Sequence, residues 1–173
     1  QYDDDFENEA QDYRCYDCVN EKKPCIGQGE NAYNGSNLKL QWQWNHNPDN
    51  RYWSLTKRPG FLRLQPVGTA QNIRNARNML TLRTMGPTCT GITVIDISHM
   101  SEGMTAGLSV FQRQYGYIAV IMEHGKKYLV MHKADHKDDA DGRCCYKTEL
   151  KNVNTIYFRI SCDFRGRRDE ATF

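Results

Sequence analysis

From Leu38 onward, the sequence consists of short runs rich in β-branched and aromatic residues, which recur at intervals of roughly ten residues. Gly, Pro, Asn and Asp separate the runs, and these residues favour turns. Only Ala70 to Asn78 could hold a helical turn. Many short strands at this spacing predict an all-β fold, an antiparallel sandwich or barrel. The expected strands cover residues 38–44, 52–55, 61–65, 78–84, 89–97, 106–112, 116–123, 127–132, 143–149 and 155–162.

Two hairpins are expected in the middle of the chain. We expect Tyr-Gly-Tyr at 115–117 to separate the strand that ends at Gln112 from the apolar run 117–122. Glu-His-Gly-Lys at 123–126 then turns this run into the next strand. The run 117–122 would be apolar on both faces of a strand, which is typical of a central strand covered on both sides.

The size and charge of the chain restrict the classes of protein that it can belong to. It has 173 residues, enough for one domain with a core. The 23 basic and 21 acidic residues leave a net charge of +2, which does not point to nucleic acid or to an anionic membrane as a partner. The apolar runs are too short to cross a bilayer. The sequence begins at Gln1 without a signal segment, so we expect a processed or excised product.

The cysteines do not form a complete disulfide framework, because the chain contains seven of them. Cys15, Cys18 and Cys25 provide one C-x-x-C pair and a third thiol, with no evident fourth ligand for zinc. A disulfide within this loop, free thiols and a metal site all remain open. Cys144 and Cys145 are adjacent, so on a strand they point to opposite faces.

All three tryptophans lie between Leu40 and Leu64. Two of them are two residues apart, so on a strand both rings share one face, while Gln41 and Gln43 take the other. Such rings can stack on sugars, and nearby polar side chains can bind hydroxyls; the alternative is that the rings fill the core. The candidate residues for contact with carbohydrate or with another domain are Trp42, Trp44, Asn45, His46, Asp49, Asn50 and Trp53.

No catalytic residue is assigned. The sequence lacks a G-x-S-x-G elbow, an H-E-x-x-H pair and a glycine-rich phosphate loop. The Asp-rich stretch 135–142 could supply oxygen ligands to Ca²⁺, yet its spacing does not complete an EF-hand loop. We interpret it as a hairpin turn that ends at Gly142 and expect no cofactor.

An ordered series of segments closely resembles the C-terminal concanavalin-A-like domain of glycoside hydrolase family 43, the β-xylosidases and α-L-arabinofuranosidases. The Trp-rich part reads LQWQWNHNPDN at 40–50, then Trp-Ser-Leu at 53–55 and Arg-Pro-Gly-Phe-Leu-Arg-Leu at 58–64. The other matching segments are Asp4-Asp5-Phe6 and residues 76–81, 86–89, 101–108, 115–118, 158–164 and 169–173.

The resemblance implies a jelly-roll β-sandwich over residues 38–173. Residues 1–37 would hold an N-terminal strand, near Asp5 and Phe6, and a cysteine-containing insertion. The family pattern continues past Phe173, so the last strands would be missing from this chain. We expect an extracytoplasmic location, periplasmic or secreted.

In this family, catalysis belongs to a preceding five-bladed propeller, so the resemblance implies that this chain alone is not catalytic. The implied function is an accessory sandwich of a glycosidase that acts on xylan- or arabinan-derived sugars. It would pack on the propeller of the same protein and help to shape its active site. The alternative is a free-standing carbohydrate-binding module. The expected partners are the propeller and plant-polysaccharide oligosaccharides, with neither nucleic acid nor membrane.

Overall fold

The computed structural model describes residues 38, 41–77 and 79–173. The chain divides into two compact units, residues 1–83 and 84–173, and each is considered by itself. The strand expected near Asp5 and Phe6 lies outside the described residues, and so do Cys15, Cys18 and Cys25.

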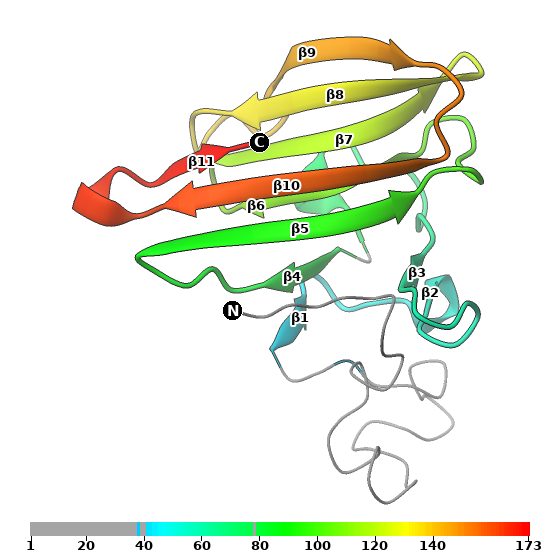
Figure 1. Cartoon of the computed structure of the whole chain (residues 1–173), viewed down its shortest axis with the longest axis horizontal. Coiled ribbons are helices and arrows are strands. Elements are labelled where there is room, and N and C mark those ends of the chain that lie inside the picture. Colours follow the sequence, from blue (N-terminus) through cyan, green and yellow to red (C-terminus); the bar gives the residue numbers. More distant parts are fainter. Residues whose placement is uncertain (1–37, 39–40, 78) are drawn as a thin grey trace, which may run out of the picture. The chain divides into compact units, whose positions relative to one another are not determined.

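The second unit is built from two antiparallel sheets (Figure 1). The four-stranded sheet is a meander of consecutive strands, and the three-stranded sheet has the order β11-β10-β5. The meander consists of β6 (Thr105–Phe111), β7 (Tyr115–Glu123), β8 (Lys126–Ala134) and β9 (Arg143–Leu150). The other sheet consists of β5 (Thr88–Asp96), β10 (Thr155–Asp163) and β11 (Glu170–Thr172), with the short 3-10 helix η3 (Arg165–Arg167) between its last two strands.

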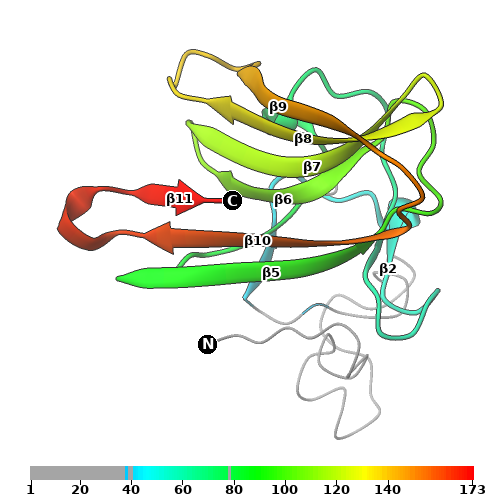
Figure 2. The ribbon, with the colours of Figure 1, turned by 45° about the horizontal axis from the view of Figure 1, so that its top comes forward.

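Side chains from both sheets form one core. The three most buried side chains of this core are each at most 2% exposed. They are Ile97 directly after β5, Val120 on β7 and Phe158 on β10. Partly buried apolar side chains surround them, and they include Leu108 and Leu129 from β6 and β8. Figure 2 shows β6 to β9 in one layer and β5 and β10 in the other. Because each sheet buries one apolar face against the other, the unit is a β-sandwich.

Strand β7 is buried on both faces, as the sequence predicts. Ala119 is 1% exposed and Val120 is not exposed at all, and successive strand residues point to opposite faces. The turn at 123–126 is also confirmed: His124 and Gly125 have φ angles of 52° and 72° between β7 and β8. Two central residues with positive φ form the hairpin turn that matches the strand twist.

The other predicted hairpin turn is displaced. Residues 115–117 belong to β7, and the turn lies at 112–114, where the N–H of Gln112 donates to the carbonyl of Gln114. Gly116 is a strand residue that packs closely: a Cβ there would lie 2.9 Å from Cζ of Phe173. A glycine inside a strand often marks such a close approach rather than a turn.

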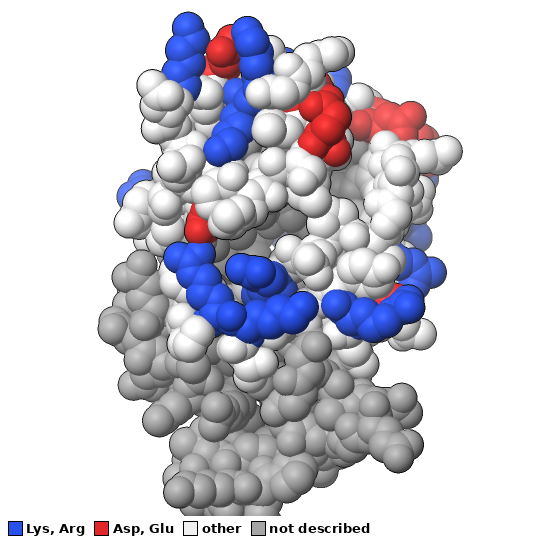
Figure 3. Space-filling model, turned by 90° about the vertical axis from the view of Figure 1, so that its right-hand side faces the viewer, with Lys and Arg blue, Asp and Glu red and all other residues white. Residues whose placement is uncertain are grey.

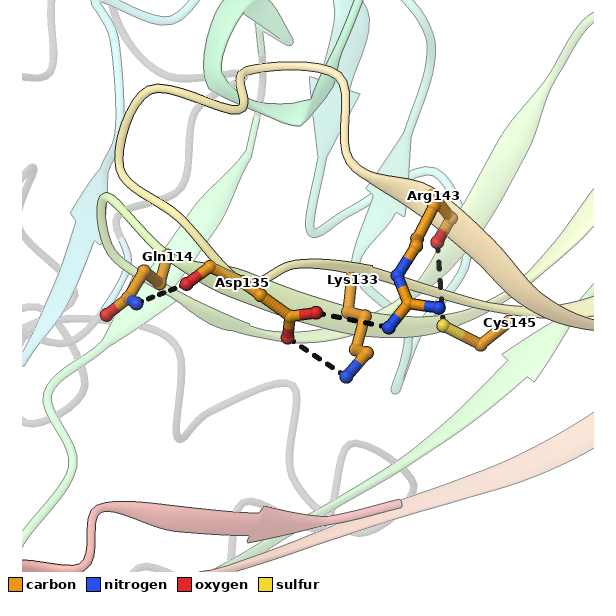
Figure 4. Close-up of polar contacts among 5 residues, drawn as sticks. All are labelled: Gln114, Lys133, Asp135, Arg143 and Cys145. Atoms are coloured by element: carbon orange, nitrogen blue, oxygen red, sulfur yellow. Dashed lines mark hydrogen bonds and ion pairs between the residues drawn. The ribbon is translucent and has the colours of Figure 1, made fainter.

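The Asp-rich loop between β8 and β9 is a hairpin connection that ends at Gly142, as expected. Asp139 accepts a hydrogen bond of 2.8 Å from the Gly142 N–H, and Gly142 has a φ of 64°. At the base of the loop, Asp135 forms ion pairs with Lys133 at 2.9 Å and Arg143 at 3.2 Å (Figure 4). These carboxylates therefore stabilise the loop itself.

The described part of the first unit contains two short antiparallel pairs. β1 (Trp42–Trp44) pairs with β4 (Leu80–Leu82), and β2 (Trp53–Ser54) pairs with β3 (Arg63–Leu64). Two 3-10 helices, η1 (Asn50–Tyr52) and η2 (Ile73–Asn75), lie in the connections. η2 is the helical turn that the sequence predicts between residues 70 and 78. The core of this unit consists of Trp53 and Leu55, with Leu38, Trp44 and Leu62 packed against them.

Each of the ten predicted strands overlaps an observed one, with boundaries shifted by a few residues. The sequence did not indicate β11, whose three residues are all exposed. It becomes a strand by pairing with β10, with Cys162 opposite Ala171. Within the described residues, no helix is long and apolar enough to span a membrane.

Candidate functional site

The Trp-rich segment brings several of the predicted site residues together in the first unit. Trp42 and Trp44 lie on one face of β1 and both are half-buried, whereas Gln43 is exposed. This agrees with the expectation that the two rings share one environment. Gln41 is half-buried as well, because it belongs to the turn before β1 and not to the strand.

Trp53 serves as the core anchor of this segment. Its side chain is only 2% exposed, and its ring centroid lies 5.1 Å from that of Trp44, with the planes tilted by 54°. The indole N–H donates a hydrogen bond of 3.0 Å to Oδ1 of Asn50. A ring this deeply buried cannot stack on a sugar in this conformation, whereas the half-buried ring of Trp42 keeps some exposed surface.

The carboxylate of Asp49 is engaged at the start of η1. It accepts a hydrogen bond of 3.1 Å from the backbone N–H of Arg51 and bonds of 2.9 and 2.6 Å from the guanidinium of the same residue. Asp49 is thus the N-cap of the helix. The side-chain hydrogen bonds from Arg51 hold the pKa of Asp49 at about 2, so the carboxylate is ionised at neutral pH.

The preceding residues connect the turn to the rest of the unit. Asn45 donates its backbone N–H to the carbonyl of Met79 at 3.0 Å, which extends the β1–β4 pairing. Nε2 of His46 lies 2.7 Å from the carbonyl oxygen of Arg74, so it donates to this acceptor. His46 and Asn47 remain exposed. The predicted site residues therefore come together, but most of their polar atoms hold the turn in place.

A shallow hollow of about 460 Å³ lies in the second unit, between the β7–β8 turn and the β9–β10 connection. On this side of the molecule, basic and acidic side chains lie beside one another (Figure 3). Lys126 forms an ion pair with Glu149 at 3.1 Å, and Lys127 donates to the carbonyl of Val153 at 3.1 Å. Two lysines of the lining are thus engaged. No local sequence pattern predicts this hollow, because its residues come from two separate turns.

The sequence also did not reveal a stack of aromatic rings on β7 and β8. The rings of Tyr117 and His132 are 5.1 Å apart and nearly parallel, and Tyr115 stacks on Tyr117 at 6.2 Å. Burial raises the pKa of Tyr117 to about 12 and lowers that of His132. Both groups are therefore neutral at pH 7, and the stack has no acid–base pair poised for proton transfer.

Two of the described carboxylates, those of Asp49 and Asp163, are unsuited to general acid catalysis. A general acid needs a pKa near the working pH, yet hydrogen bonds from Arg51 and Arg165 lower the pKa values of Asp49 and Asp163 to about 2. Within the described ranges, no group of three or more His, Cys, Asp or Glu side chains could hold a metal ion. The expectation that the chain holds no cofactor, with Ca²⁺ as the alternative considered for the Asp-rich stretch, stays a prediction.

Comparison with known proteins gives the family. The model of the β-xylosidase C-terminal concanavalin A-like domain matches residues 30–173, which is most of the chain. The chain belongs to this family. The all-β sandwich and the resemblance to family 43 glycosidases (GH43) are thereby confirmed, whereas the missing last strands and the domain boundary at residue 38 stay predictions.

Relatives of this GH43 C-terminal domain are parts of larger proteins. A β-xylosidase of Formosa agariphila is 32% identical over an alignment of 136 residues, and the match covers 62% of this chain and 23% of that protein. A solved bifunctional GH43-CE protein of Bacteroides eggerthii is 46% identical, with a TM-score of 0.72 over 78% of this chain and 17% of that one.

A third relative is a solved GH43 glycoside hydrolase engineered to display both endo-xylanase and exo-arabinofuranosidase activity. It is 28% identical to the present domain, with a TM-score of 0.66 over 73% of this chain and 26% of that one. The domain therefore spans about a quarter or less of the length of these relatives. Its structural neighbours are GH43 proteins that contain much more than this sandwich.

Proposed function

We propose that the domain is the accessory β-sandwich of a family 43 glycosidase that acts on xylan- or arabinan-derived sugars. It packs on a catalytic propeller outside this chain and helps to shape the active site. The observation that carries the proposal is the family match over residues 30–173, together with relatives at least four times as long as the aligned segment.

The chemistry of the described residues supports an accessory role. Two ionised carboxylates form ion pairs within the domain, Asp49 with Arg51 and Asp163 with Arg165. An inverting or retaining glycosidase needs one carboxyl group that stays protonated near neutral pH and a second one opposite to it. The strongly lowered pKa values of Asp49 and Asp163 do not suit the first role.

The test compares the glycosidase that contains this chain with the same protein lacking residues 38–173. On aryl β-xylosides and aryl arabinofuranosides, we expect removal of the sandwich to lower kcat/KM at least about tenfold, because it removes a wall of the substrate pocket. The separate chain of residues 1–173, shown to be folded by near-ultraviolet circular dichroism, should give no turnover. Turnover by the separate chain would contradict the proposal.

The alternative, a free-standing carbohydrate-binding module, has one favouring observation: Trp42 is only half-buried, and His46 and Asn47, four and five residues later in the sequence, are exposed. Under this alternative, xylo- or arabino-oligosaccharides should quench tryptophan fluorescence, and the quenching should disappear in Trp42→Phe. Binding to the separate chain with a loss in the variant would favour the module. A flat titration at millimolar sugar would favour the accessory role.

A further inference from the structure

Two free cysteines, Cys89 and Cys162, lie directly opposite each other in the second unit. Cys89 is the second residue of β5, and Cys162 is the last but one residue of β10. The register between these strands runs without a shift from the Thr88–Asp163 pair to the Asp96–Thr155 pair. The two thiols are thus held side by side by the sheet, although most of the unit lies between them in the sequence.

The type of pairing follows from the hydrogen bonds at the two ends of the ladder. The N–H of Ile97 donates to the carbonyl of Asn154 at 2.8 Å, and the N–H of Phe164 donates to the carbonyl of Pro87 at 2.9 Å. In an antiparallel ladder, hydrogen-bonded pairs occur at every second position. The cysteine pair is therefore a hydrogen-bonded pair.

At such a pair the Cα atoms are about 5.5 Å apart, which lies within the range of about 4.4–6.8 Å seen in disulfides. The Cβ atoms of opposite residues are about 4.5–5.5 Å apart, and a hydrogen-bonded pair lies toward the longer end, above the disulfide range of about 3.5–4.5 Å. The two Cβ atoms must therefore approach each other by about 1 Å for a bond to form, which requires a local adjustment of the two strands. Both residues lie near strand ends, where the backbone can adjust most easily.

The two thiols differ in exposure. Cys162 shares the inner face of β10 with the buried Phe158 and Ile160, and it is only 6% exposed. Cys89 is half-buried. Burial raises the pKa of Cys162 to about 11, and the neighbouring Cys89 thiol contributes to this. Solvent reagents therefore meet Cys89 first.

We propose that Cys89 and Cys162 form a thiol–disulfide exchange site, which small disulfides such as oxidised glutathione convert into a reversible cross-strand disulfide. In the first step the Cys89 thiolate attacks one sulfur of the small disulfide, forms a mixed disulfide and releases one thiolate. In the second step Cys162, after losing its proton, attacks the Cys89 sulfur and releases the second thiolate. The protein loses two electrons and two protons, and the small disulfide is reduced to two thiols.

The exchange would connect β5 to β10 covalently at one end of the sandwich and close a long loop. A cross-link of this kind restricts the unfolded chain and so raises the melting temperature of the oxidised form. A reductant would reverse the change. The proposal concerns the sandwich itself and does not depend on which sugar a catalytic partner cleaves.

The test uses the full chain in a mixture of oxidised and reduced glutathione, followed by alkylation of free thiols with N-ethylmaleimide and peptide mass spectrometry. We expect peptides linked through Cys89 and Cys162, which separate on treatment with dithiothreitol. In C162A, the reaction should stop at a stable glutathione adduct on Cys89. In C89A, Cys162 should stay unmodified while the protein is folded.

The exposed neighbours Cys144 and Cys145 are the matched control in the same sample, and they should acquire glutathione. The proposal would be overturned if Cys89 and Cys162 stay free while these controls react. A wild-type adduct on Cys89 as abundant as that in C162A would also overturn it. So would a link from Cys89 to Cys15, Cys18 or Cys25. The wild-type result stands without the variants, should either of them fail to fold.

Discussion

The indole N–H of Trp53 and the side-chain oxygen of Asn50 are joined by a hydrogen bond of 3.0 Å. The tryptophan is 2% exposed, and the asparagine is the first residue of η1. The buried Trp53 therefore depends on the side chain of Asn50 in the polar turn. The Asn and Asp residues of this turn suggest a ligand site in the sequence, whereas in the structure Asn50 stabilises the core.

Replacement of Asn50 by Ala should destabilise the protein by about 1–3 kcal/mol, because it leaves a buried indole donor without this acceptor. Urea unfolding monitored by tryptophan fluorescence measures the change. Asn47→Ala, in the same turn but exposed, is the matched control and should stay within about 0.5 kcal/mol of the wild type. Equal effects of the two substitutions would contradict the structural role of Asn50.

Gly107 and Gly91 lie on different strands and should respond to Ala in opposite ways. A Cβ at Gly107 would meet the backbone of the facing strand, with the Ala119 Cα at 2.6 Å, so we expect a loss of about 3 kcal/mol. A Cβ at Gly91 would have no neighbour within 4 Å. Since Ala restricts the unfolded chain, Gly91→Ala should stabilise by about 0.5–1 kcal/mol.

Chemical denaturation of both glycine variants provides the measurement. A similar stability change at the two positions would show that the close approach of β6 and β7 at Gly107 is not maintained in solution.

Phe158 and Tyr157 are neighbours in β10 that point to opposite faces. Phe158 is 2% exposed in the core, and Tyr157 is 70% exposed. Phe158→Ala should cost about 3–5 kcal/mol, because it removes a large buried ring and leaves a cavity. Tyr157→Ala should change the free energy of unfolding by about 0.5 kcal/mol or less. Unfolding midpoints in guanidinium chloride decide between these values, and a reversed order would contradict the assignment of the inner face.

Glu102 holds the β7–β8 turn through its carboxylate. The carboxylate accepts hydrogen bonds from the backbone N–H groups of His124 at 2.7 Å and of Gly125 at 3.0 Å. The bond from Gly125, followed by that from His124, holds the pKa of Glu102 below its usual value of 4.5. The ionised form is therefore favoured by folding. Its stabilising effect is complete above the unfolded-state pKa and is lost as the pH falls through the lower folded-state pKa.

We expect Glu102→Gln to lower the melting temperature at neutral pH, because it removes the charge that these donors favour. The difference from the wild type should shrink as the pH falls below 4.5 and through the lower folded-state pKa, because Glu102 then becomes protonated as well. Melting curves of both proteins across this range provide the measurement. A difference that stays constant over the whole range would show that the charge of Glu102 does not contribute.

Much of the sheet structure could be predicted from the sequence, because local chemistry determines it. The run 117–122 is apolar on both faces, which predicts a central strand, and His-Gly at 124–125 can adopt the two positive φ angles of a tight turn. Gly116 lies in a strand, although the sequence predicts a turn there. A larger side chain at this position would collide with the ring of Phe173, which is more than fifty residues later in the sequence. Close packing between distant segments leaves no local pattern.

The sequence predicts which residues gather at the candidate site but not the contacts that their side chains form. The spacing of Trp42 and Trp44 correctly placed their rings in one environment. It could not reveal that His46 contacts the carbonyl of Arg74, because that partner is 28 residues away. Nor could composition distinguish an aromatic ring available to a ligand from one that fills the core, as Trp53 does.

The pairing of β5 with β10 also determines the order in which this sandwich can assemble. The whole meander β6 to β9 lies between these two strands in the sequence, whereas the meander itself forms from local hairpins. Closing the long loop costs chain entropy before any contact compensates for it, so the meander forms first and the β5–β10 ladder later. During synthesis on the ribosome, β5 emerges well before its partner. Until β10 leaves the exit tunnel, β5 is an unpaired strand whose edge can bind other nascent chains.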